Sequence, residues 1–244
     1  MATTATRLLR RLLGGALDVV FPPRCVGCDR WGAALCSSCR HGLPRLLPPF
    51  CARCSEPLAG PSAERGASLC VRCRDHPLAI DGIRSPYLME GAIRRAILEL
   101  KYQGVASLAV TLGRLLHDYL EAHPLPADVI VPLPLHSRRQ RRRGFNQAAL
   151  LAKEVGRLRH RPVGADLIVR VRNSPSQAQA ATAEERRANV KGAFQVREGA
   201  ALGGKRVLLV DDVCTTGATL DACARALKEA GAAEVWGLTV ARER

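Results

Sequence analysis

The chain has 244 residues, 47% of them apolar, which suffices for one large domain or for a domain with a small module. Its formal charge of +15 favours anionic partners such as nucleic acid, phosphorylated metabolites or acidic lipid, although an Arg- and Ala-rich genome also produces such a charge. No stretch of about 18 apolar residues occurs, so we expect no transmembrane helix.

Residues 1–24 predict a short amphipathic helix that ends at a Pro-Pro break. Leu9, Leu13 and Leu17 recur on one helical face. Arginines precede this apolar run, as in a signal peptide, but Asp18 interrupts it and no small-residue cleavage site follows. Such a helix packs on its own protein or makes a peripheral contact with a membrane surface. We therefore expect a cytoplasmic protein, either free or at the inner face of the membrane.

Residues 25–76 carry four Cys-x-x-Cys pairs, and in a reducing compartment such clusters usually bind metal. Each pair places two thiolates on one tight turn, and two pairs complete a tetrahedral Cys₄ site for Zn²⁺. We therefore predict a double zinc ribbon with two structural zinc ions, and the spacings leave open which pairs combine. Redox dithiols and an iron–sulfur cluster are the alternatives. The expected ligands are Cys25, Cys28, Cys36, Cys39, Cys51, Cys54, Cys70 and Cys73.

Residues 79–244 alternate strand-like and helix-like stretches, which predicts an α/β domain with a largely parallel sheet. Apolar residues at helical spacing predict helices over 92–100, 108–121, 145–158 and 218–230. Short apolar or alternating runs predict strands over 82–89, 128–133, 165–171, 193–196, 206–210 and 234–240.

A basic segment follows the strand expected over 128–133. We expect this segment to be a loop. Guanidinium groups bind phosphate oxygens as bidentate forks, so the loop suits a phosphorylated ligand. A nucleic-acid backbone or plain solvent are the alternatives. The arginines of this basic rim are Arg138, Arg139, Arg141, Arg142 and Arg143.

A phosphate-binding loop is predicted where the strand over 206–210 runs into Asp211 and Asp212 and then into a helix. Open α/β sheets bind ligands at strand ends, and a helix N-terminus favours an anion. The two carboxylates suit ribose hydroxyls or Mg²⁺. An acidic turn before a capped helix is the simpler alternative, but two adjacent acids repel each other. The residues expected to hold the phosphate are Cys214, Thr215, Thr216, Gly217, Ala218 and Thr219.

The stretch from the apolar strand to the Thr/Gly loop resembles the motif with which type I phosphoribosyltransferases bind 5-phosphoribosyl 1-pyrophosphate (PRPP). The resemblance implies that Asp211 and Asp212 bind the ribose hydroxyls and that residues 214–219 hold the 5′-phosphate. It also implies that pyrophosphate contacts Leu133, Pro134, Leu135 and His136. A flexible loop that closes over PRPP would contain Arg172, Ser174, Gln177 and Arg187.

Nearly the whole chain is similar to the ComF family, which is tied to DNA uptake in competent bacteria. Ser174 and Ala180 depart from the usual Thr and Leu of that family. Besides the four cysteine pairs, the matching motifs are Leu100-Lys-Tyr-x-Gly104, Val131-Pro-x-Pro134, Arg143-Gly-Phe-Asn-Gln147, Arg170-x-Arg172 with Gln177, Arg187-x-Asn-Val-x-Gly-Ala-Phe194 and Val210-Asp-Asp-Val-x-Thr-Thr-Gly-Ala-Thr219.

The resemblance implies transfer of a phosphoribosyl group from PRPP, with Mg²⁺, to an unknown acceptor and with release of pyrophosphate. No residue stands out as a general base. Two other functions remain open: a PRPP-binding protein without catalysis, and a component of the DNA-uptake machinery that binds single-stranded DNA. The resemblance also implies a helicase-like ATPase as a partner.

Overall fold

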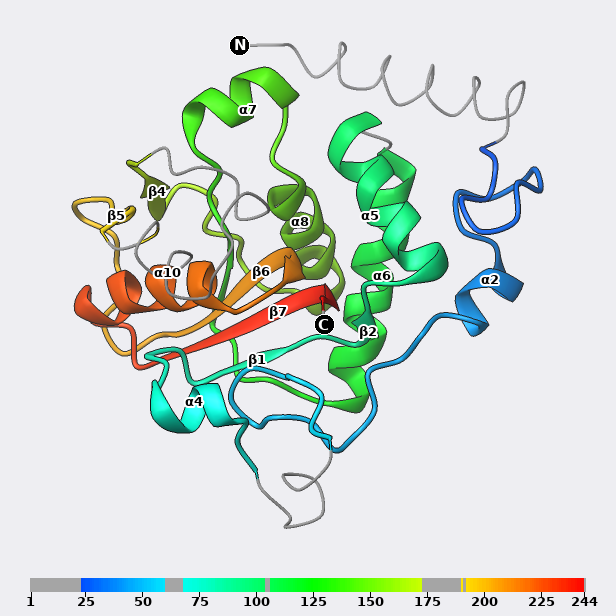
Figure 1. Cartoon of the computed structure of the whole chain (residues 1–244). Coiled ribbons are helices and arrows are strands. Elements are labelled where there is room, and N and C mark those ends of the chain that lie inside the picture. The colour runs from blue at the N-terminus through cyan, green and yellow to red at the C-terminus, as the bar shows by residue number, and fades with distance from the viewer. Residues whose placement is uncertain (1–22, 60–67, 104–105, 173–189, 191, 244) are drawn as a thin grey trace, which may run out of the picture.

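The computed structural model describes residues 23–59, 68–103, 106–172, 190 and 192–243. The amphipathic helix expected over residues 1–24 lies outside this part of the chain, apart from its last two residues. A central sheet with helices on both faces dominates the structure, and the N-terminal segments lie along one side of it (Figure 1). None of the described helices is long and apolar enough to cross a membrane.

The central sheet is parallel throughout, as the alternation of strands and helices predicts. Its strands lie in the order β1 (Gly82–Arg84), β7 (Glu234–Arg242), β6 (Arg206–Cys214) and β3 (Val129–Pro132), and β2 (Tyr87–Leu88) also pairs with β7. In the pairing of β3 with β6, Val129 lies opposite Val207. The carboxyl ends of these neighbouring strands therefore meet at one edge of the sheet, where open α/β sheets bind ligands.

The strand expected over 82–89 is interrupted in its middle. β1 and β2 pair with β7 in one continuous register, Gly82 opposite Trp236 and Tyr87 opposite Ala241. Between β1 and β2 lie Ser85 and Pro86. Because proline has no backbone N–H to donate, the ladder of hydrogen bonds stops there.

The two faces of β6 pack against different helices. Leu208 and Val210 belong to the core cluster formed with α5 (Gly91–Gln103), α6 (Ala106–Ala122) and α8 (Gln147–Arg159). Val207 and Leu209 belong to a second cluster, which includes α10 (Ala218–Glu229). Figure 1 shows α10 on one side of the sheet and α5, α6 and α8 on the other. Side chains that follow one another along β6 therefore face different helices.

A small two-stranded sheet joins the cluster on the α10 side. β4 (Ile168–Arg170) pairs antiparallel with β5 (Phe194–Val196), and Ile168 and Phe194 are buried in that cluster. The strands predicted over 165–171 and 193–196 are thus present, but they form a sheet separate from the parallel one.

Helical spacing of apolar residues explains the burial of α5 and α6. On α6, Leu108, Leu112 and Leu116 recur every four residues and are all fully buried. On α5, Ile93 and Ile97 repeat the pattern. Burying one such side chain contributes about 1.5–3 kcal/mol, so this layer is held chiefly by the aliphatic residues that the sequence places on one face.

The basic segment predicted as a loop contains a helix, α7 (Ser137–Arg143). At its N-terminus the His136 side chain accepts a hydrogen bond from the Arg138 backbone N–H, at 3.3 Å. At its C-terminus Gly144 adopts the left-handed conformation that commonly ends helices, with φ of 78°. None of its residues is buried, so the apolar periodicity that predicts other helices is missing here.

The cysteine-containing segments pack along β1 and β2. Short helices begin directly after a cysteine in α2 (Ser37–His41) and in α4 (Val71–Asp75). The Ile83 N–H donates to the Arg53 carbonyl at 2.8 Å, and the Leu88 N–H donates to the Pro44 carbonyl at 2.8 Å. The N-terminal region therefore packs against β1 and β2 through backbone hydrogen bonds.

Candidate functional site: a cleft at the carboxyl edge of the sheet and two cysteine clusters

The acidic pair at the end of β6 lies within the strand rather than after it. β6 continues to Cys214, which pairs with Arg242 of β7. Asp211 therefore lies on the α10 side of the sheet and Asp212 on the α5 side. Asp212 is buried, and its Oδ1 lies 3.0 Å from Nζ of Lys101 on α5.

Lys101 is a site residue to which the sequence assigned no role. It appears there only within the motif that starts at Leu100. Burial opposes its charge, but the Asp212 carboxylate raises the pKa of Lys101 and keeps the ammonium group protonated.

One carboxylate oxygen of Asp212 is left without a partner. Its Oδ2 is buried and has no hydrogen-bond partner among the described residues. Such an atom costs about 1–3 kcal/mol unless a ligand supplies a donor or a cation. Burial, together with the neighbouring Asp212 charge, raises the pKa of Asp211 to about 8. Asp211 is thus poised to lose a proton when a ligand that donates hydrogen bonds arrives.

The loop between β6 and α10 has the geometry of an anion site. Gly217 adopts φ of +80°, and a Cβ there would lie 2.8 Å from Cδ1 of Ile83, so any other residue would be strained at this turn. The Thr216 hydroxyl accepts from the Ala218 N–H at 3.3 Å. The N-terminus of α10 directly follows, and its backbone N–H groups and dipole favour an anion.

A single cleft of about 640 Å³ brings together most of the predicted site residues other than the cysteine ligands. Six cationic and four acidic side chains line it, which suits an anionic ligand. The predicted residues that line it are Leu133, Pro134, Leu135, Arg139, Arg143, Asp211, Asp212, Cys214, Thr215, Thr216, Gly217 and Thr219.

Other predicted residues lie apart from this lining. His136, Arg138, Arg141, Arg142, Arg172 and Ala218 are described residues that do not line the cleft. Ser174, Gln177 and Arg187 of the expected flexible loop lie outside the described residues.

Helix α7 explains why the five arginines separate. Arg139 and Arg143 are one turn apart and line the cleft. Arg138, Arg141 and Arg142 are exposed and do not line the cleft. The guanidinium of Arg143 also lies 5.6 Å from the ring centroid of Tyr102, which lines the cleft and is 70% exposed. The arginines that form one continuous basic run in the sequence therefore divide into two that line the cleft and three that face solvent.

The cleft also contains cations and acids that the sequence did not mark as binding residues. Arg170 of β4 reaches it, and Arg94 of α5 lines it beside Lys101. Glu56 and Arg72 come from the second cysteine segment. The family motifs contain Arg170, whereas no pattern in the sequence pointed to Arg94, Glu56 or Arg72.

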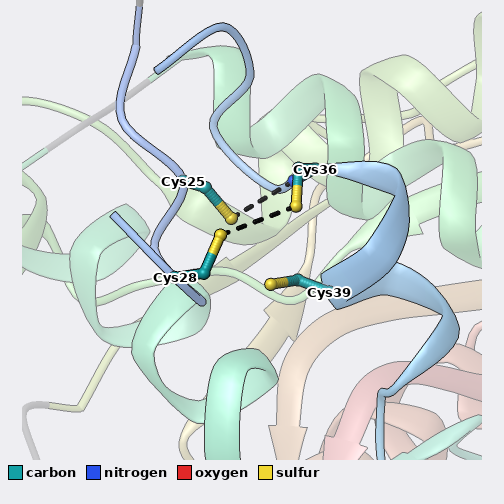
Figure 2. Close-up of side chains that lie close together, drawn as sticks. All are labelled: Cys25, Cys28, Cys36 and Cys39. Atoms are coloured by element: carbon teal, nitrogen blue, oxygen red, sulfur yellow. Dashed lines mark hydrogen bonds between the residues drawn. The ribbon is translucent and has the colours of Figure 1, made fainter. Parts of the chain in front are cut away.

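The eight N-terminal cysteines form two separate clusters. In each cluster the four sulfur atoms lie within 4.8 Å of one another, and the clusters are Cys25, Cys28, Cys36 and Cys39, and Cys51, Cys54, Cys70 and Cys73. Figure 2 shows the sulfur atoms of the first cluster facing one another. Neighbouring pairs therefore combine, and the exchanged arrangement that the spacing left open does not occur.

The sulfur geometry fits zinc. A tetrahedral site with Zn–S bonds of about 2.3 Å requires sulfurs about 3.8 Å apart. Cys28 and Cys36 Sγ lie 3.8 Å apart, and Cys54 and Cys70 Sγ lie 3.7 Å apart. Burial opposes ionisation of Cys25, but N–H groups that include those of Cys36 and Gly27 donate to its Sγ and lower its pKa to about 6. Each cluster is therefore suited to hold one structural zinc ion.

Two protein-family models match parts of the chain. Residues 16–76 match a double zinc ribbon domain, and residues 140–244 match a phosphoribosyl transferase domain. The parallel sheet, the acidic pair at the end of β6 and the cysteine clusters thus define a protein with a type I phosphoribosyltransferase fold and an N-terminal double zinc ribbon.

Three relatives are similar along most of their length. Competence protein F of Haemophilus influenzae is 33% identical over 84% of this chain and 89% of that protein. Competence protein ComFC of Bacillus subtilis is 30% identical over 85% of this chain and 84% of that protein. DNA utilization protein YhgH of Salmonella typhi is 33% identical over 86% of this chain and 91% of that protein. The chain belongs to the ComF family.

Proposed function

We propose that the cleft binds PRPP and that the protein transfers its phosphoribosyl group to an acceptor. The observation that carries the proposal is the unpartnered, buried Oδ2 of Asp212 beside a glycine-containing anion loop. A ribose hydroxyl supplies the missing donor, and a phosphate on the same sugar suits the loop at the start of α10.

The remaining cations suit the pyrophosphate group. Arg139, Arg143 and Arg170 line the cleft together with Leu133 and Pro134, the residues after β3. Arginine forks bind phosphate oxygens through paired hydrogen bonds. We assign these residues to the pyrophosphate, which carries much of the charge of PRPP.

In the proposed reaction the bond between C1′ and the pyrophosphate oxygen breaks, and its electron pair leaves with pyrophosphate. A lone pair of the acceptor forms the new bond to C1′. The chain positions the sugar through the two acids and neutralises the leaving group through its arginines. Mg²⁺ bound with PRPP supplies further charge neutralisation. An acceptor that carries an N–H or O–H group releases this proton to solvent as the new bond forms.

Calorimetric titration of the zinc-loaded protein with PRPP and Mg²⁺ tests the proposal, with ribose 5-phosphate as the ligand that lacks pyrophosphate. We expect PRPP to bind at least tenfold more tightly than ribose 5-phosphate. If neither sugar phosphate binds to folded protein, the cleft does not serve PRPP.

The affinity for PRPP should rise with pH. Hydroxyl donors favour an ionised carboxylate, and in the free protein the pKa of Asp211 is raised to about 8. Below that pH, binding must therefore release a proton from Asp211, so affinity increases from about pH 6 to pH 8 and then levels off. Titrations at several pH values check this. In Asp211→Asn the affinity should depend less steeply on pH than in the wild type. An equal dependence in both proteins would assign the effect to another group, such as the phosphate of the ligand.

A second candidate function rests on the exposed face of α7. Arg138, Arg141 and Arg142 are exposed and lie outside the cleft, and they suit a nucleic-acid backbone. The names of the relatives, competence and DNA utilization proteins, favour the same partner. We propose that this face binds single-stranded DNA during DNA uptake, alongside a helicase-like ATPase.

Replacing Arg138, Arg141 and Arg142 together with Gln should weaken binding to single-stranded DNA. Since each lost phosphate contact lowers the slope of log affinity against log salt by about 0.7, we expect a slope smaller by about 2. Fluorescence anisotropy with a labelled oligonucleotide at several salt concentrations measures this. A control variant with Gln at the exposed Arg40, Arg74 and Arg225 carries the same change of charge. Equal losses in both variants would contradict a specific role for α7.

A further inference from the structure

A fully buried arginine stands at the end of the last strand. Arg242 of β7 has no solvent exposure. Its Nη1 donates to the Cys54 carbonyl at 2.8 Å and to Cys214 Sγ at 3.0 Å, and its Nη2 pairs with Glu56. Nε has no partner among the described residues. A buried cation is costly unless it is paired, so these contacts hold Arg242 in place.

The partners of Arg242 belong to two different sites. Cys54 is a member of the second cysteine cluster. Cys214 is the last residue of β6 and precedes the phosphate loop directly. The backbone reinforces this connection, because the Glu243 N–H donates to the Cys214 carbonyl at 2.9 Å. One guanidinium group therefore spans the cysteine cluster and the start of the loop.

A second arginine extends the connection. Arg72 lies between two cysteines of the cluster, and its Nη2 donates to Glu56 Oε2 at 2.9 Å and approaches Cys54 Sγ at 3.7 Å. Glu56 thus accepts from both Arg72 and Arg242. Glu56 and Arg72 also line the cleft, beside Cys214. Two cations share one carboxylate at this wall, which leaves positive charge next to the phosphate loop.

The first cluster has different neighbours. Arg95 of α5 donates to the Val26 carbonyl at 2.6 Å and to the Gly27 carbonyl at 2.7 Å. These contacts tie the first cluster to a helix rather than to the phosphate loop. The two clusters thus offer a matched comparison within one chain.

We propose that Arg242 is a positioning residue that couples zinc binding at the second cluster to phosphate binding in the cleft. Metal bound by the four cysteines holds the Cys54 carbonyl and Arg72 in place, and these hold Arg242 against Cys214. The phosphate loop then keeps the shape that receives the anion. Since coupling between two sites is reciprocal, an anion in the cleft also slows the loss of zinc from the second cluster. The identity of that anion as PRPP rests on the proposed function.

Transfer of zinc to a chromogenic chelator tests the coupling in the full-length, zinc-loaded protein, with and without PRPP and Mg²⁺. In the wild type we expect PRPP to slow the release of one of the two zinc ions at least tenfold and to leave the other unchanged. In Arg242→Met this protection should disappear, and the affinity for PRPP should fall at least tenfold. Arg95→Met, the control at the first cluster, should keep both properties.

The proposal would be overturned if Arg242→Met bound PRPP as tightly as the wild type and if PRPP slowed its zinc release to the same extent. If that variant does not fold, the wild type alone decides, because equal zinc release with and without PRPP also overturns it.

The proposed function can fail separately. If the wild type binds no PRPP, zinc release is compared between folded Arg242→Met and the wild type without any added anion. Faster release of one zinc ion from Arg242→Met still supports the connection between Arg242 and the second cluster. Unchanged release refutes it. If PRPP binds but leaves zinc release unchanged, only the coupling is refuted.

Discussion

Asp212→Asn should lower the affinity for PRPP about 10- to 100-fold while the protein remains folded. The Asp212 side chain is 5% exposed, its Oδ1 pairs with Lys101, and its Oδ2 has no partner among the described residues. A hydrogen bond to a charged group contributes about 1.5–3 kcal/mol, and tenfold in affinity corresponds to about 1.4 kcal/mol. Asparagine keeps one acceptor oxygen but places an NH₂ donor where the ribose hydroxyl must donate.

The measurement is calorimetric titration with PRPP and Mg²⁺, with thermal melting as the check on folding. Asp128→Asn is the matched control. Asp128 forms an ion pair with Arg206 at the opposite, amino-terminal edge of the sheet, where Oδ1 and Nη2 lie 2.7 Å apart. This control should change the affinity less than twofold. Tight binding by Asp212→Asn would show that the ribose hydroxyls are held elsewhere.

Cys54→Ser should destabilise the protein by several kcal/mol, and considerably more than Cys28→Ser. All four cysteines of the second cluster are buried, and with Leu58 they form a small core of their own. In the first cluster Cys28 is exposed. Because metal-binding free energy is part of folding free energy, about 10–16 kcal/mol in zinc-finger peptides, losing the buried site is the larger cost. Domain stability itself is only about 5–15 kcal/mol.

Zinc content and thermal melting of both variants measure this effect. We expect each variant to lose one of its two zinc ions, with the lower melting temperature in Cys54→Ser. Chelation of the wild type should reproduce the destabilisation without any substitution. A Cys54→Ser protein that keeps two zinc ions and melts like the wild type would contradict a structural role for the second cluster.

Local patterns in the sequence were enough to predict the main architecture of the protein. The spacing of Cys-x-x-Cys pairs predicts zinc ribbons because two thiolates on one turn need only a second pair. Apolar periodicity predicts α5, α6 and α10 because burial requires one apolar face per helix. Gly217 identifies the tight turn after β6, since a left-handed φ at close approach needs glycine. Each of these inferences depends on residues that are near one another in the chain.

Contacts between distant segments required the tertiary structure. Lys101 faces Asp212 only because α5 covers one face of β6, and Arg242 joins Cys54 to Cys214 only because β7 lies beside β6. No local pattern encodes such pairs, because the packing of separate elements brings them together. The helix over residues 137–143 could not be predicted from apolar periodicity either, because none of its residues is buried and it therefore has no apolar face. That helix decides which arginines face the cleft and which face solvent, a sorting that a run of identical charges cannot specify.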